Sequence, residues 1–108
     1  MIAPKAPRMT PRESKQGYER VAERSFGLCE ACGVRQATQM HHRLHRSHGG
    51  DERVTNLLHL CLWCHGEAHQ HERRYADGLA VRSGGNPALR PVLYRGRLAI
   101  LTAEGGLA

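Results

Sequence analysis

Apolar and polar positions in the first part of the chain follow a helical period. Thr10, Pro11 and Glu13 form a helix start, because threonine can cap, proline suits the first helical position and glutamate can close a capping box. Apolar and small residues then recur at helical spacing until Gly27, which can end a helix. The pattern predicts a helix over residues 11–26 with a narrow apolar face.

The middle of the chain changes to strand patterns and then returns to a helical one. Residues 36–44 predict a strand, and the polar segment that contains Gly49 and Gly50 predicts a loop. The apolar run at residues 57–60 predicts a second short strand. From residue 61 to about residue 75 the pattern is helical. Two strands followed by a helix, all behind an N-terminal helix, predict a small α+β fold.

The end of the chain holds two further strand patterns. Residues 91–94 and 97–102 predict strands joined by a turn around Arg95 and Gly96. Two interpretations are open for this segment. It is either a small β-hairpin packed on the domain or a flexible arm.

The length of the chain limits it to one small domain, or to a small domain with tails. A chain of 108 residues buries a modest core, and small cores often need a bound metal for stability. We expect a disordered basic tail over residues 1–10 and a folded domain, including the N-terminal helix, over residues 11–76. We expect residues 77–108 to form a C-terminal tail that contains the possible hairpin.

Basic side chains outnumber acidic ones, and the excess lies outside the centre of the chain. The sequence has 16 lysines and arginines against 10 acidic residues, with a pI near 9.7. Residues 1–26 and residues 70–108 each carry six basic and three acidic side chains, whereas residues 27–69 carry four of each. Basic flanks around a neutral centre favour a polyanionic partner such as nucleic acid. The alternative is that these arginines are ordinary solvated surface residues.

The sequence contains no sign of a membrane or secreted protein. It has no run of 18 or more apolar residues, and the N-terminal stretch MIAPKAPRMTPR has no apolar signal core. We therefore expect a cytoplasmic protein. In a reducing compartment, paired Cys-x-x-Cys motifs more often hold zinc than form disulfides.

The four cysteines form two Cys-x-x-Cys pairs, Cys29 with Cys32 and Cys61 with Cys64, separated by 28 residues. Two such pairs supply four thiolates to a tetrahedral zinc ion and leave no position open for a substrate. The pattern predicts a structural zinc site that ties the end of the first helix to the start of the last. The alternative is four buried or disulfide-linked cysteines.

Histidine is concentrated in the same region. Seven of the eight histidines lie between residues 41 and 69. His65 and His69 are four residues apart, so both imidazoles project from one face of a helix. His41 and His42 are adjacent on a strand and point to opposite sides, so only one of them can easily join that pair on a metal. Three imidazoles with open coordination positions make a catalytic metal site.

The order of these residues resembles the HNH nuclease motif. A His-His pair is followed by Asn56 after 13 intervening residues, by His65 after eight more and by His69 after three more. The His-His start and the His-x-x-x-His end resemble the nuclease domains of DNase colicins, and the Cys-x-x-Cys pairs resemble the zinc-stabilised branch of the family. The sequence pattern HHR…GG…TNLLHLCxxCHGxxH is most similar to that of small HNH endonucleases of phages and prophages. The resemblance covers residues 29–69 and implies a ββα-metal core.

The resemblance also implies roles for individual residues. His42 matches the general base that activates the attacking water, and Asn56 matches the residue whose side-chain amide braces the hairpin. His41, His65 and His69 match the metal ligands. The first ligand is an aspartate in many relatives, so an all-histidine set departs from the commoner form.

Two arginines and the choice of metal complete the expected site. Arg43 and Arg46 follow the base, and we expect them to contact the scissile phosphate. Three histidine ligands suit zinc, nickel, cobalt or manganese better than magnesium. We expect manganese or nickel to support activity and magnesium to support less. We expect zinc at the active site to give only slow turnover of the substrate. Ordinary structural or surface roles are the default for the remaining histidines, His45, His48, His59 and His71.

The resemblance implies a metal-dependent DNA endonuclease that leaves 5′-phosphate ends. It further implies a phage protein in the host cytoplasm, a monomer that works beside terminase subunits during DNA packaging. Restriction and mobile-element behaviour are alternatives for the biological role, and RNA is an alternative substrate. A different class of function is also open, a zinc-stapled module that binds nucleic acid without cutting it. The basic flanks and the cysteines suit both classes, whereas the histidines at nuclease spacing favour the enzyme.

Overall fold

The computed structural model describes residues 8–108, and helix α1 begins where the sequence predicts. This helix spans Pro11–Ser25. The Thr10 side chain accepts a hydrogen bond from the Glu13 N–H at 3.1 Å, and the Thr10 N–H donates to the Glu13 carboxylate at 2.9 Å. The predicted capping box is therefore confirmed. The left-handed residue that ends the helix is Phe26, with φ of 58°.

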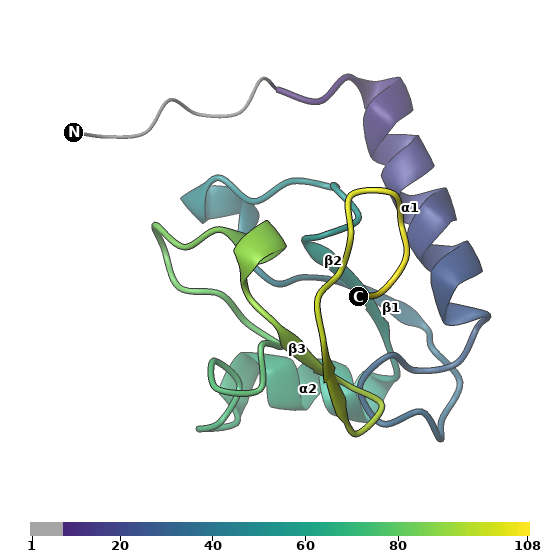
Figure 1. Cartoon of the computed structure of the whole chain (residues 1–108), viewed down its shortest axis with the longest axis vertical. Coiled ribbons are helices and arrows are strands. Elements are labelled where there is room, and N and C mark those ends of the chain that lie inside the picture. Colours follow the sequence, from purple (N-terminus) through teal and green to yellow (C-terminus); the bar gives the residue numbers. More distant parts are fainter. Residues whose placement is uncertain (1–7) are drawn as a thin grey trace.

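A two-stranded antiparallel sheet and a second helix follow α1 (Figure 1). Strand β1 spans Gln39–His42, β2 spans Leu57–Leu60 and α2 spans Leu62–Gln70. In the register of the pair, His41 lies opposite Leu58 and His42 lies opposite Leu57. Strand β1 is shorter than the predicted 36–44, and β2 has the predicted bounds. The α+β fold with a ββα core is confirmed.

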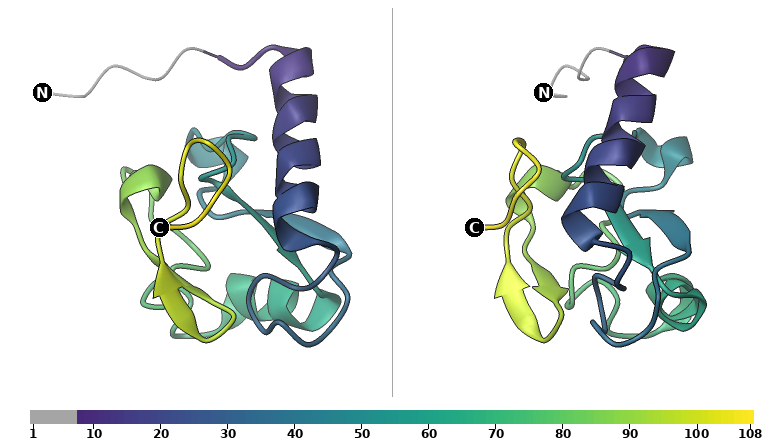
Figure 2. Two further views of the ribbon diagram at one scale, coloured as in Figure 1. Left: turned by 45° about the vertical axis from the view of Figure 1, so that its right-hand side comes forward. Right: turned by 90° about the vertical axis from the view of Figure 1, so that its right-hand side faces the viewer.

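The sheet is covered on both faces, and this explains why β2 reads as a nearly continuous apolar run. On one face, Leu57 packs with Val21 of α1. On the other face, Leu58 and Leu60 pack with Ala68 of α2. Alternation along a strand sends neighbouring residues to opposite faces, so adjacent residues of β1 also face different helices. Figure 2 shows α1 and α2 on either side of the strand pair.

Helix α2 is shorter than predicted, because the chain must turn back toward the core. The pattern predicted a helix to about residue 75, but the helix ends at Gln70. After several turns, the carbonyl of Gly78 accepts a hydrogen bond from the side chain of Arg43 at 2.8 Å. The Val81 N–H donates to the backbone carbonyl of the same arginine at 2.8 Å. A longer helix would carry the chain away from these partners.

The C-terminal segment forms a hairpin that packs on the domain. Strands β3 (Val92–Tyr94) and β4 (Arg97–Ala99) are antiparallel, and the turn between them has positive φ at Arg95 and Gly96. The first and last residues of β3 lie in the same apolar cluster as residues of β2 and α2. The Arg95 guanidinium donates to three carbonyls near the end of α1, those of Ser25, Leu28 and Cys29. In this structure the segment is therefore a small hairpin packed on the domain.

Residues 1–7, most of the predicted disordered tail, lie outside the described residues. Residues 8–10 lead into α1 without regular secondary structure. Within residues 8–108, no helix is long and apolar enough to cross a lipid bilayer.

Arg43 directly follows β1, and its side chain is fully buried. All three guanidinium nitrogens donate to carbonyl oxygens at distances between 2.8 and 3.5 Å. The acceptors are the carbonyls of Gly78, Thr55, Pro87, Arg90 and Pro91. The prediction that Arg43 binds nucleic acid is wrong, because its guanidinium N–H groups all donate to backbone carbonyls inside the fold. Burial, with a smaller contribution from the charge of Arg24, lowers the pKa of Arg43 to about 10.

We expect Arg43→Lys to lower the free energy of unfolding by about 2–4 kcal/mol. A lysine ammonium cannot span the same set of carbonyls, and each buried acceptor left without a donor costs about 1–3 kcal/mol. Chemical denaturation of the purified protein measures the change, with Arg97→Lys on exposed β4 as the matched control. Equal stability of the two variants would contradict the structural role of Arg43.

Candidate active site and metal centres

The four cysteines gather at the junction between α1, the sheet and α2. Cys29 and Cys32 lie in the turn after α1, Cys61 caps the N-terminus of α2, and Cys64 lies in its first turn. Their Sγ atoms all lie within 4.8 Å of one another, about twice a Zn–S bond of ~2.3 Å. All four are free thiols. The residue set predicted from the two Cys-x-x-Cys pairs is therefore one cluster.

The electrostatics of this cluster favour a bound cation. Burial raises the pKa of Cys32, but the N–H groups of Arg35 and Val34 and the neighbouring thiols outweigh burial and lower the pKa to about 6. Burial and the adjacent thiols raise the pKa of Cys64 instead. Four thiolates so close together repel one another, and a divalent cation removes that penalty. The donor set thus fits a structural zinc ion.

Three histidines form a second cluster on the face of the sheet that α2 covers. His41 comes from β1, and His65 and His69 come from α2. One ring nitrogen from each lies within 4.8 Å of the others, and the Nε2 atoms of His65 and His69 are 3.1 Å apart. The i, i+4 spacing therefore brings both helix histidines to one point, next to only one member of the His-His pair.

The surroundings of His41 favour a neutral imidazole. Its Nε2 lies 2.6 Å from the carbonyl oxygen of Leu79, which can only accept, so Nε2 carries the hydrogen and Nδ1 keeps its lone pair. Burial lowers the pKa of His41 to about 4, although the Leu79 carbonyl partly opposes it. Burial also lowers the pKa of His65, followed by the effect of His69. A metal ligand fixed by a second hydrogen bond is typical of histidine sites.

His42 lies on the opposite face of β1, toward α1. Its Nε2 is 2.9 Å from an oxygen of the Glu52 carboxylate. The Tyr18 ring of α1 meets the imidazole edge-on, with 6.4 Å between ring centroids. A cavity of about 360 Å³ is nevertheless lined by His42 together with all three histidines of the cluster. His41 and His42 therefore point to opposite faces of the strand, yet both line the same cavity.

Glu52 is a residue of this site that the sequence did not single out. Burial raises the pKa of Glu52, but hydrogen bonds from Ser14 and His42 and the charge of Arg46 outweigh burial, and the pKa lies below its ordinary value. Ser14 donates to one carboxylate oxygen at 2.7 Å, and Arg46 lies 3.8 Å from the other. The sequence signal was weak, because an acidic residue after a Gly-Gly loop usually faces solvent.

The Asn56 side chain braces the loop between β1 and β2 through three hydrogen bonds. Its side-chain oxygen accepts from the Leu44 N–H at 2.8 Å, and its side-chain nitrogen donates to the carbonyls of Leu44 and Asp51 at 3.1 and 2.9 Å. The amide is buried. Since Asp51 precedes Glu52, this bracing also locates the carboxylate that contacts His42.

The remaining histidines lie at the rim of the site, beside α1 or in exposed positions. His45 is exposed at the rim, with its ring centroid 5.8 Å from that of His69. His59 is a structural residue, because Ser25 Oγ of α1 lies 2.7 Å from its Nδ1. His48 and His71 are exposed.

Comparison with known proteins identifies a family for the segment that carries both clusters. A family model described as HNH endonuclease matches residues 29–71. The comparisons with curated proteins and with solved structures found no match. The matched segment holds both Cys-x-x-Cys pairs, the β1–β2 pair and α2. An HNH domain supports nuclease activity, with nucleic acid as substrate and a divalent metal as cofactor. Residues 29–71 of this chain are therefore an HNH endonuclease domain, built around a cysteine cluster that can form a zinc site.

Proposed function

We propose that the protein is a metal-dependent endonuclease that hydrolyses DNA phosphodiester bonds. The observation that supports this most strongly is the shared cavity, which a histidine held by a carboxylate and a cluster of three ligand-forming histidines both line. Hydrolysis of a phosphodiester needs an activated water and stabilisation of the leaving oxygen. These two requirements are met from opposite faces of one strand.

The chemistry of the site follows from the hydrogen bonds of its residues. Because the Glu52 carboxylate accepts from Nε2 of His42, the other ring nitrogen, Nδ1, is left to take a proton from the attacking water. A divalent cation held by His41, His65 and His69 would supply Lewis-acid stabilisation of the leaving 3′-oxygen. Arg46 is exposed at the edge of the same cavity and can contact the scissile phosphate.

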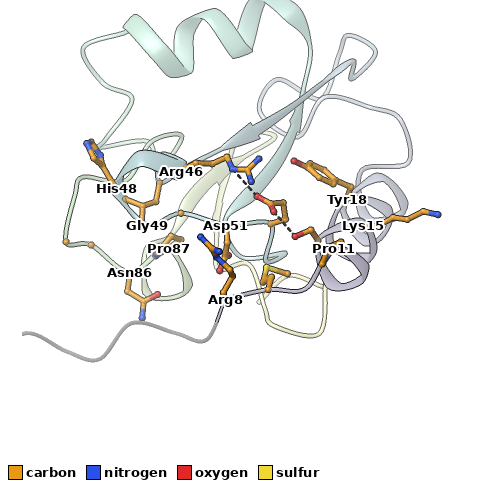
Figure 3. A pocket seen from close by; sticks show the side chains of 17 residues that line it. Arg8, Pro11, Lys15, Tyr18, Arg46, His48, Gly49, Asp51, Asn86 and Pro87 are labelled. Atoms are coloured by element: carbon orange, nitrogen blue, oxygen red, sulfur yellow. Dashed lines mark hydrogen bonds and ion pairs between the residues drawn. The ribbon is translucent and has the colours of Figure 1, made fainter.

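A larger groove beside the site supports a nucleic-acid substrate (Figure 3). A cavity of about 1360 Å³ lies between the start of α1, the β1–β2 loop and residues 84–87. Its basic and histidine lining residues are Arg8, Lys15, Arg46 and His48. The two acidic lining residues are already paired, Asp51 with Arg53 and Glu52 with His42. Arg46 lines both cavities, so a phosphate backbone bound in the groove can extend to the histidine cluster.

The finer assignments rest on the resemblance of the motif alone. A role beside terminase subunits in phage DNA packaging stays a prediction, as do the monomeric state and the cytoplasmic location. Preference for DNA over RNA is tested by offering both. A non-catalytic zinc-stapled binding module is the main competing function, and it is the outcome if the wild type binds DNA but cuts none.

We expect His42→Ala to abolish most cleavage while the metal and DNA still bind. Removal of a positioned general base costs roughly 10²–10⁴-fold in rate. Conversion of supercoiled plasmid is measured with manganese, nickel, magnesium or chelator, and His71→Ala serves as a matched control on an exposed histidine. We expect manganese and nickel to support cutting, magnesium less, and the chelator none. Wild-type rates in His42→Ala would remove His42 as the base.

We expect Cys29→Ser to lose the structural zinc ion and the cooperative unfolding transition. A small domain with a metal cross-link depends on the metal for much of its folding free energy. Metal analysis and thermal melting measure both effects, with Val34→Ser in the same turn as a control at an exposed position. A variant that melts cooperatively without zinc would show that the cysteines are not a folding site.

We expect Lys15→Gln to weaken DNA binding and to reduce its dependence on salt. Each phosphate contact that is lost lowers the slope of log K against log salt concentration by about 1. Arg97→Gln removes a charge from β4, outside both cavities, and is the control. Equal effects of the two substitutions would mean that the groove is not the binding path.

A further inference from the structure

We infer that helix α1 is part of the catalytic apparatus, because Ser14 fixes the carboxylate of Glu52 and Glu52 in turn orients the imidazole of His42. Glu52 and Ser14 are positioning residues, and neither is assigned a role by the HNH match. The inference rests on the proposed function of His42 as the general base. It adds that the orientation of this base depends on a helix outside the matched segment 29–71.

The first contact decides which nitrogen of His42 is available. An ionised carboxylate can only accept hydrogen bonds, so the 2.9 Å contact from Glu52 places the hydrogen of the neutral imidazole on Nε2. The lone pair is then on Nδ1. Without the carboxylate, both tautomers would be populated and the ring could rotate. A base in the wrong tautomer presents N–H to the attacking water and cannot accept its proton.

The second contact holds the carboxylate itself. Ser14 Oγ donates to the other oxygen of Glu52 at 2.7 Å. The Glu52 side chain is almost fully buried, with 6% of its area exposed. An ionised carboxylate is costly to bury unless its oxygens are paired. Ser14 and His42 supply one donor to each oxygen, so the carboxylate has a single defined orientation.

Backbone packing brings the helix close enough for this contact. Gly17 lies one turn after Ser14, and a Cβ atom placed on it would be 1.9 Å from the backbone oxygen of Glu52. Only glycine permits this approach. From the other side, the Asn56 side chain holds the carbonyl of Asp51, the residue before Glu52. The loop is therefore fixed between α1 and the sheet, with its carboxylate aimed at His42.

The kinetic test begins with Glu52→Gln in the full-length, metal-loaded protein. We expect kcat for cleavage of a DNA duplex to fall about 10–100-fold, the range seen when outer hydrogen-bond partners of a site residue are removed, with KM unchanged. Ser14→Ala is expected to lower kcat in the same direction, and Ser14→Thr, which keeps a hydroxyl, to restore it. Glu23→Gln removes another acid from an exposed position of α1 and is the control.

A double variant separates positioning from two independent effects. If Ser14 acts only through Glu52, then Ser14→Ala combined with Glu52→Gln is no slower than Glu52→Gln alone. Effects that multiply would overturn the relay. A structural staple would lower the melting temperature and leave kcat of the folded protein unchanged, which would also overturn it.

The tautomer of His42 gives a readout independent of turnover. In the zinc-loaded protein with ¹⁵N-labelled histidine, long-range proton–nitrogen spectra are expected to show hydrogen on Nε2 of His42, with this preference lost in Glu52→Gln. An Nδ1–H tautomer in the wild type would contradict the inference even if Glu52→Gln fails to fold. If His42→Ala still cuts, the proposed function fails. If only His42→Ala is inactive and both positioning variants match the wild type, this inference alone fails.

Discussion

The arrangement of the site depends on the alternation of side chains along one short strand. His41 and His42 are adjacent in β1, so they face opposite sides of the two-stranded sheet. Helix α2 covers one side and brings two more imidazoles to His41, whereas α1 covers the other and brings Ser14 toward the carboxylate that contacts His42. One side with three clustered imidazoles and another side with an imidazole bound to a carboxylate thus arise from a single dipeptide.

Buried arginines hold the connections around this sheet. Arg43 satisfies carbonyls of the loop before β2 and of the segment that leads to the hairpin. Arg24 of α1 forms a buried ion pair with Glu30, at 2.6 Å, and also donates to the carbonyls of Val54 and Leu57. Irregular backbone without ladder partners needs donors from elsewhere. In a small chain with many loops, the guanidinium group supplies several at once, which explains part of the basic composition without nucleic acid.

The nuclease signature and the additions outside it serve different purposes. The matched segment supplies the cysteine cluster, the histidine cluster and the proposed base, His42. The N-terminal helix and the C-terminal hairpin extend the apolar core on either side, through Val21 and Val92. The helix also borders the basic groove, together with the β1–β2 loop. Segments that first look like structural cover therefore shape where a polyanion can lie relative to the histidines.

The sequence by itself determined those features that depend on local geometry. A capping box and a short apolar run specify α1 and β2 locally, and the i, i+4 and Cys-x-x-Cys spacings each bring two side chains together. That these pairs would join more distant residues in two clusters was predicted from the numbers and types of metal-binding side chains and from the motif. Tertiary structure decided the rest, because it depends on contacts between residues far apart in the chain. Arg43 looked like a phosphate contact until its carbonyl partners at residues 55 and 78–91 were known. Glu52 likewise drew attention only in the folded chain, where Ser14, 38 residues earlier, donates a hydrogen bond to its carboxylate.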